Sequence, residues 1–189
     1  RAGPARRAGS EAVGAPRREY VNRFADRLID HKEAIARLIT LEQGKPYAAS
    51  LGEVQRAADS MREICSISIE NELLREDERG RVELHYRPLG VIAAIAPWNV
   101  PIALAAPKIA SALYTGNAVI LKPSSMTPLS SLKMAEVTAD VLPKGLFSVL
   151  AGGGQLGGRL TEHPGIGQGN FSGSGATGKP VMAACSQKP

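Results

Sequence analysis

The sequence predicts an α/β fold with a parallel sheet and flanking helices. Two apolar runs, 91–96 and 118–121, have the length of buried strands, and each leads to a polar residue held by proline. The stretch 102–113 between them has a helical pattern, so the three segments form a strand–helix–strand unit. Open parallel sheets bind ligands at the carboxyl ends of their strands, which places Asn99 and Lys122 where a ligand would lie. If the segments 97–101 and 121–124 stood alone, two rigid turns would be a more frequent explanation than a ligand site.

Hydrophobic spacing predicts the other elements in chain order. Helices are expected at 17–40, 47–71, 128–142, 156–161 and from about 174 onward. Strands are expected at 82–86, 147–150 and near 171. A charged link over 72–81 precedes the first strand, and Gly44 with Pro46 ends the first helix. Pro180 falls inside the last helix, which we expect to be kinked or frayed because proline removes a helical hydrogen bond.

The composition excludes several classes of protein. Net charge is +5 over 189 residues, but it is concentrated in the first eighteen residues by Arg1, Arg6, Arg7, Arg17 and Arg18. With aromatic residues at 4%, the chain lacks the stacking platforms of a nucleic-acid-binding protein. No apolar run approaches the ~18 residues of a membrane span, and no Cys-x-x-Cys predicts a metal site. Its two cysteines predict no disulfide framework and favour a cytoplasmic location.

Five spaced segments resemble motifs of the NAD(P)-dependent aldehyde dehydrogenase superfamily. They are 41–46 (Leu-Glu-Gln-Gly-Lys-Pro), Pro97-Trp98-Asn99, 121–124 (Leu-Lys-Pro-Ser), His163-Pro164 and 171–174 (Phe-Ser-Gly-Ser). The likeness extends from about Pro16 to Met182, and several motifs in the family's order are more specific than any one alone. The resemblance implies a Rossmann-like parallel sheet, preceded by N-terminal helices and by part of an oligomerisation arm.

The resemblance also implies how the chain is organised. Residues 1–16 would be a flexible basic tail, and a transit segment is the alternative. Residues 17–189 would be an incomplete cofactor-binding domain. A strand at about 81–87 would belong to an arm that joins subunits into a homodimer or homotetramer. The family's glutamate segment, catalytic cysteine and catalytic domain do not occur in this sequence, so the resemblance implies a fragment of a longer enzyme.

The implied reaction is the oxidation of an aldehyde to a carboxylic acid, with NAD or NADP as cofactor. In the family a cysteine thiolate attacks the aldehyde, and negative charge develops on the former carbonyl oxygen. The resemblance assigns Asn99 to the oxyanion hole, where a fixed amide N–H stabilises that charge. The alternative is that Asn99 caps the helix expected from about residue 102.

The resemblance implies a cofactor site assembled from several loops. Its residues would be Ile95, Ala96, Pro97, Trp98, Lys122, Ser125, Gly153, Gly157, Phe171, Ser172, Gly173 and Ser174. Lys122 would reach ribose hydroxyls or a phosphate, unless it is an ordinary solvated lysine. Relatives that prefer NAD often carry glutamate where this chain has Ser125, and a carboxylate there would repel the 2′-phosphate of NADP, so we expect NADP to be tolerated. The helix that begins near Ser174 would meet the pyrophosphate.

Two glycine patterns suggest other nucleotide sites, and each is incomplete. Gly152, Gly154 and Gly157 match G-x-G-x-x-G, but no acidic residue lies about twenty positions further on, as the ordinary dinucleotide fingerprint requires. The segment 173–179 nearly completes a P-loop, but Pro180 replaces the Ser or Thr that holds magnesium. Two alternatives to the dehydrogenase stay open: a catalytically inactive remnant that binds a nucleotide or a partner subunit, and a P-loop nucleotidase.

Overall fold

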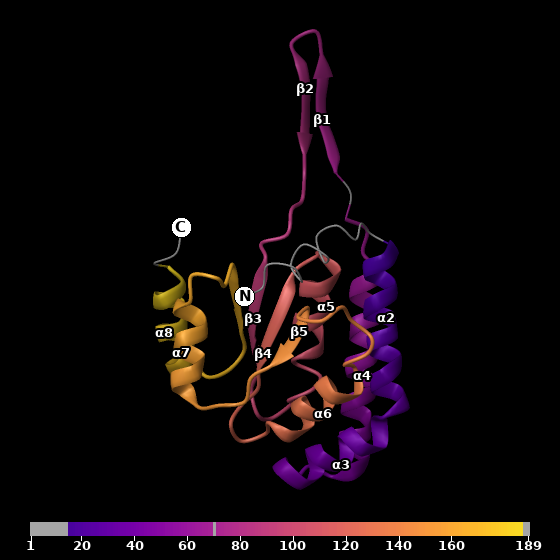
Figure 1. Ribbon diagram of the computed structural model, residues 1–189, viewed down its shortest axis with the longest axis vertical. Coiled ribbons are helices and arrows are strands. Elements are labelled where there is room, and N and C mark those ends of the chain that lie inside the picture. The colour runs from indigo at the N-terminus through magenta and orange to yellow at the C-terminus, as the bar shows by residue number, and fades with distance from the viewer. Residues whose placement is uncertain (1–14, 70, 187–189) are drawn as a thin grey trace.

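The computed structural model describes residues 15–69 and 71–186, and it confirms the predicted α/β fold (Figure 1). Its centre is a four-stranded parallel sheet with helices on both faces. The strand order is β5–β4–β3–β6, formed by Phe147–Val149, Ala118–Lys122, Val91–Ile95 and Gln168–Phe171. The predicted basic tail lies almost entirely outside the described residues.

Strand β3 is the central element of this sheet. All five of its residues are buried, since it has a strand on each side and helices over both faces. Its last residue, Ile95, pairs with Lys122 of β4 and with Phe171 of β6. Because these parallel strands end level with one another, the segments that follow them begin at one edge of the sheet.

The connections between strands distribute the helices over the two faces. α5 (Ala106–Tyr114) joins β3 to β4, and α6 (Leu129–Val137) joins β4 to β5. The chain then returns through α7 (Gly154–Glu162) to β6, and α7 lies with α8 (Gly175–Cys185) on the opposite face (Figure 1). The strand order therefore reverses at β3, and ligands of open α/β sheets bind at such a switch point.

Three helices at the N-terminal side pack against α5 and α6: α2 (Ala15–Asp30), α3 (Lys32–Gln43) and α4 (Tyr47–Ser66). The single helix predicted over 17–40 is wrong, because the helix breaks at His31, whose ψ of 19° lies outside the helical range. The break allows Leu28 and Ile35 both to reach full burial although α2 and α3 run in different directions (Figure 1). α3 ends at Gly44, whose φ of 79° is left-handed and suits glycine.

A two-stranded arm projects from one end of the molecule (Figure 1). β1 (Glu72–Asp77) pairs antiparallel with β2 (Gly80–Leu84), and every residue of both strands is exposed. The charged link predicted over 72–81 is therefore wrong, and the strand predicted at 82–86 lies two residues earlier. The sequence contains no strand signal for β1, because its residues are largely charged and a ribbon exposed on both faces needs no alternating apolar face. The helix predicted to reach residue 71 ends at Ser66, before this arm.

Other boundaries also differ from those predicted. α5 begins at Ala106 after a series of turns, rather than at 102, and α6 ends at Val137, well before 142. α8 continues through Pro180 to Cys185, so this proline does not end the helix. Pro180 and Ala176, whose carbonyl loses its helical donor, are both exposed, and water can replace the missing hydrogen bond.

The hydrophobic core joins the first helices to the edge of the sheet. Phe24 of α2 is fully buried and meets Phe147 of β5 edge to face, with ring centroids 5.3 Å apart at an interplanar angle of 69°. Edge-to-face contact stabilises an aromatic pair beyond the effect of the area that it buries. Met61 and Ile109, both fully buried, extend the same core between α4 and α5.

We predict that Phe24→Ala lowers the free energy of unfolding by about 3–5 kcal/mol, because it removes buried apolar surface and leaves a cavity beside Phe147. Urea denaturation followed by circular dichroism measures this change. Leu41→Ala in α3 is the control, since Leu41 is 72% exposed and its truncation should change the free energy by less than about 0.5 kcal/mol. Equal losses in the two variants would contradict the structural role of Phe24.

Candidate functional site

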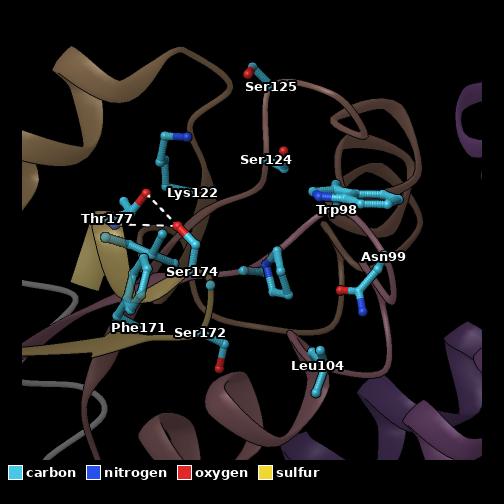
Figure 2. A pocket seen from close by; sticks show the side chains of 14 residues that line it. Trp98, Asn99, Leu104, Lys122, Ser124, Ser125, Phe171, Ser172, Ser174 and Thr177 are labelled. Atoms are coloured by element: carbon cyan, nitrogen blue, oxygen red, sulfur yellow. Dashed lines mark hydrogen bonds between the residues drawn. The ribbon is translucent and has the colours of Figure 1, made fainter.

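A cavity of about 670 Å³ opens where β3, β4 and β6 end (Figure 2). It is lined by Ile95, Ala96, Pro97, Trp98, Asn99, Leu104, Lys122, Ser124, Ser125, Phe171, Ser172, Gly173, Ser174 and Thr177. The structure thus brings together eleven of the thirteen predicted site residues, while Gly153 and Gly157 lie outside the lining. Leu104, Ser124 and Thr177 were not predicted, although each lies in or beside a segment that was.

Asn99 lies at the pocket with an exposed side chain (Figure 2). Its side-chain amide forms no hydrogen bond with another described residue, so its N–H groups are available to a ligand. The alternative that Asn99 caps a helix is wrong. The N–H groups of Ile102 and Ala103 donate instead to Oε1 of Glu53, at 2.9 and 3.4 Å, and α5 begins only at Ala106.

The backbone of Asn99 is held by the turn between α3 and α4. Its carbonyl oxygen accepts hydrogen bonds from Nε2 of Gln43 at 2.5 Å and from Nζ of Lys45 at 2.9 Å. Nε2 of Gln43 also donates to the carbonyl oxygen of Trp98 at 2.8 Å. The sequence marks this turn as a motif, but its contact with a loop 56 positions away was not predicted, because the order of residues does not show which segments meet.

Lys122 ends β4 and is almost completely buried, with 7% of its surface exposed. This contradicts the alternative of an ordinary solvated lysine. Its Nζ donates to the carbonyl oxygen of Pro123 at 3.0 Å, and burial lowers the pKa of the amine because it desolvates the charged form. Gly157 of α7 lies beside this side chain, since a Cβ there would be 3.8 Å from Cδ of Lys122. α7 therefore packs along the lysine stem.

The pocket favours ligands that carry negative charge or hydroxyl groups. Among its described lining residues Lys122 is the only charged one, and none is acidic. A desolvated ammonium gains stability from an acceptor that replaces the water it has lost. Ser125 is exposed on the loop after β4, and Oγ of Ser124 accepts a hydrogen bond from the backbone N–H of Met126 at 3.2 Å, which stabilises this loop.

The third wall of the pocket is the segment that leads from β6 into α8. Ser174 caps α8, and its Oγ accepts a hydrogen bond from the backbone N–H of Thr177 at 3.3 Å (Figure 2). Glycine at position 173 lets the chain lie against the ring of Phe171, because a Cβ there would come within 2.6 Å of Cζ. The other N–H groups at the start of α8, together with the helix dipole, suit an anion.

Lys108 supports this segment, and sequence reasoning missed it. It is buried in α5, and its Nζ donates to Oδ1 of Asn170 and to Oγ of Ser172, each at 2.8 Å. Burial lowers the pKa of this amine as well. A lysine among the apolar residues of 106–114 is the signal that could have revealed it, because such a group needs partners when it is buried.

The two glycine patterns have other structural roles. Gly178 and Lys179 lie inside α8, and Lys179 is exposed, whereas a P-loop places its lysine beside bound phosphates. The P-loop alternative is therefore wrong. Gly153, from the other pattern, is the N-cap residue of α7.

The described residues, 15–69 and 71–186, contain no group of three or more His, Cys, Asp or Glu side chains that could hold a metal ion. None of the helices in these ranges combines the length and the apolar character that crossing a bilayer requires. The pocket at the sheet edge, which eleven of the predicted site residues line, is the candidate functional site of the described structure.

A family model matches the sequence over almost its whole length. The model of the aldehyde dehydrogenase family matches residues 2–189. Over 175 residues the chain is 39% identical to aldehyde dehydrogenase LUC3 of a Fusarium species, an alignment that covers 93% of this chain and 37% of LUC3.

Two solved structures show the same likeness. The dehydrogenase of 3,6-anhydro-L-galactose, in complex with NADP, is 30% identical with a TM-score of 0.92, over 97% of this chain and 40% of its own. A betaine aldehyde dehydrogenase variant from Staphylococcus aureus, in complex with NAD+, is 30% identical with a TM-score of 0.90, over 96% and 39%. The chain spans about two fifths of the length of these relatives. The family model covers nearly the whole sequence and the solved relatives share the fold, so the chain belongs to the aldehyde dehydrogenase family.

Proposed function

We propose that the chain is the cofactor-binding portion of an enzyme that oxidises an aldehyde to a carboxylic acid with NAD+ or NADP+. The pocket carries this proposal, since it joins the amide of Asn99, the buried amine of Lys122 and the start of α8 in one cavity. Membership of the aldehyde dehydrogenase family supports the same reaction, and solved relatives are complexes with NADP and NAD+.

The lining residues fit a dinucleotide cofactor. Lys122 and Ser125 would hold ribose hydroxyls or a 2′-phosphate, and Ser174 with the start of α8 would hold the pyrophosphate. Trp98 and Phe171 add apolar surface, and the absence of acidic groups among the described lining residues suits the charge of the phosphates. When bound, the cofactor supplies the hydride acceptor of the reaction. Gly153 and Gly157 stay predicted contacts of the same ligand.

The proposed reaction converts an aldehyde, NAD(P)+ and water into a carboxylic acid, NAD(P)H and a proton. Attack on the carbonyl carbon moves an electron pair onto the carbonyl oxygen, and the amide of Asn99 would donate an N–H to that oxygen. Neither cysteine of this chain is placed to act as the nucleophile. Burial raises the pKa of the Cys65 thiol, and neither Cys65 nor Cys185 lines the pocket. We therefore assign attack to a thiolate supplied by another part of the enzyme.

A second candidate function is the binding of a nucleotide or a partner subunit without catalysis. The placement of the two cysteines favours it, because a pocket without a thiol can bind a cofactor but cannot attack an aldehyde. This alternative and the main proposal differ in whether the full-length protein turns over an aldehyde.

The arm supports a proposal about assembly. β1 and β2 expose Leu73, Leu74, Val82 and Leu84 to solvent, and Tyr86 follows them. Apolar side chains grouped on a projecting ribbon are typical of a surface that another chain covers. We propose that this arm joins subunits into a homodimer or homotetramer.

The two free cysteines support a cytoplasmic location.

Loss of the oxyanion donor should slow the chemical step. We predict that Asn99→Ala in the full-length enzyme lowers kcat by about 10²–10³-fold, the usual cost of removing one such donor. The KM for NAD(P)+ should stay within about threefold, because the interaction is made in the transition state. Initial rates of NAD(P)H formation measure both constants. Full turnover by this variant would show that the role assigned to Asn99 is wrong.

A carboxylate at position 125 should favour NAD+. We predict that Ser125→Glu raises the ratio of KM for NADP+ to KM for NAD+ at least about fivefold, because repulsion of about 1–4 kcal/mol acts on the 2′-phosphate. Ser125→Gln, which has the same length without the charge, is the matched control and should leave this ratio nearly unchanged. Titration of both cofactors tests the prediction. An unchanged ratio in Ser125→Glu would contradict it, and a strong preference of the wild-type enzyme for NAD+ would count against the expectation that NADP is tolerated.

The 189-residue chain alone should bind the cofactor without oxidising aldehydes. Trp98 is the only tryptophan and lines the pocket, so NADPH should change its fluorescence. Absorbance at the NADPH band should stay at background when aldehyde and NADP+ are supplied. Turnover that persists after Cys65→Ser and Cys185→Ser would be independent of cysteine and would contradict this prediction.

A further inference from the structure

One turn of the chain contacts both loops that carry the pocket's polar residues. The segment 41–46 comprises the end of α3 and the turn that leads into α4, and three of its side chains, those of Glu42, Gln43 and Lys45, reach across to these loops. We call Gln43, Lys45 and Glu53 of α4 the clamp, because all three bind the loop that follows β3. The clamp does not line the pocket, so it acts on a ligand only through that loop.

Gln43 binds two successive carbonyl groups of the loop. Its Nε2 lies 2.8 Å from the carbonyl oxygen of Trp98 and 2.5 Å from that of Asn99. Two acceptors on one side require the amide to present its nitrogen there. This orientation leaves Oε1 of Gln43 buried without a hydrogen-bond partner among the described residues. The two hydrogen bonds to the loop therefore fix the orientation of the Gln43 amide, although this orientation leaves one acceptor unsatisfied.

Lys45 and Glu53 form an ion pair that also binds the backbone of the loop after β3. The ammonium of Lys45 forms an ion pair with Glu53, whose side chain is completely buried, and it donates to the carbonyl oxygen of Asn99 at 2.9 Å. Oε1 of Glu53 accepts from the N–H of Ile102 at 2.9 Å. The backbone is thus fixed at the carbonyl of Asn99 and again three residues later. The buried pair is satisfied on both sides by contacts to this loop.

Glu42 makes the equivalent contact with the loop after β4. Its carboxylate accepts from the backbone N–H groups of Leu129, at 2.7 Å, and Ser130, at 3.1 Å, at the start of α6. Glu42 therefore anchors the far end of the segment that carries Ser124 and Ser125. The neighbouring side chains of one turn consequently set the positions of both loops relative to each other.

The clamp matters because it holds the backbone from which the side-chain amide of Asn99 projects. The side chain of Asn99 has no hydrogen bond with a described residue, so its N–H groups are aimed by the backbone alone. An oxyanion donor stabilises charge only when it is oriented in advance, and a displacement of about 1 Å can cost about 100-fold in rate. The rigidity of the backbone at Asn99 therefore determines how well its amide can act.

We propose that Gln43, Lys45 and Glu53 are positioning residues that hold the amide of Asn99 in place for transition-state stabilisation. This inference rests on the proposed oxidation of aldehydes by the full-length enzyme. The clamp acts through Asn99, and it therefore contributes to kcat rather than to cofactor binding.

A double-mutant cycle in the full-length enzyme tests the proposal. Gln43→Met removes both donors to the loop while keeping side-chain length and adding no charge. Gln55→Met is the matched control, because Gln55 of α4 bonds Lys32 at 2.9 Å and Asp59 at 3.1 Å and does not contact the loop. We expect Gln43→Met to lower kcat about tenfold or more, with the KM for NAD(P)+ nearly unchanged, and Gln55→Met to leave kcat within about twofold. In the Asn99→Ala background, Gln43→Met should have less than about a twofold effect on kcat.

Each outcome of the cycle decides one point. A tenfold loss that vanishes in the Asn99→Ala background supports the proposal. Unchanged kcat in Gln43→Met, or an equal loss in both backgrounds, overturns it, because a purely structural role does not require Asn99. If Gln43→Met fails to fold, the pair Lys45→Met with Glu53→Gln enters the same cycle, since it removes both charges together. Equal aldehyde turnover by the wild-type and Asn99→Ala enzymes would overturn the role of Asn99 and this inference with it, while leaving the proposed function intact. An enzyme that oxidises no aldehyde would contradict the proposed function itself.

Discussion

The functional features of this molecule depend on the parallel pairing of β3 with β4 and β6. Ile95 lies level with Lys122 and with Phe171, so three strands deliver three loops to one edge of the sheet. The fully buried residues Ala93 and Ala94 keep β3 narrow, which suits close packing on both faces of the sheet. A shift of one residue in this register would exchange the two faces of β4 and redirect Lys122 away from its present surroundings. The geometry of the pocket is therefore a direct consequence of strand register.

Much of this arrangement could be predicted from sequence because its signals are local. Val91–Ile95 and Ala118–Lys122 are short apolar runs, and the polar residues after them follow from where such strands end. The ends of these strands point to Asn99 and Lys122, and the other nine of the eleven predicted residues that line the pocket were implied by the family resemblance. Gly153 and Gly157 were implied by the same resemblance, and the described pocket does not include them, although Gly157 lies beside Lys122.

The features that escaped prediction are those that depend on contacts between distant segments. β1 is charged and exposed, and only its pairing with β2 makes it a strand. The residues around His31 have an unbroken helical pattern, yet the helix breaks there, and α2 and α3 each pack mainly against α4. Lys108 and Gln43 are ordinary helix residues until the fold brings Ser172 to one and Asn99 to the other. Local propensity contains no information about such partners.

The contacts that hold the Asn99 loop have a further consequence for how the molecule folds. Gln43 is separated along the chain from its partners Trp98 and Asn99 by 55 and 56 positions, and Glu53 is separated from Ile102 by 49. Closing such long loops costs chain entropy before any contact repays it, whereas β3, α5 and β4 can assemble from near neighbours. The loop therefore reaches its final shape only after α3 and α4 have docked, and it loosens whenever they separate. Amide hydrogen exchange at Ile102, whose N–H donates to Glu53 of α4, would consequently report the docking of these helices, not the stability of the sheet.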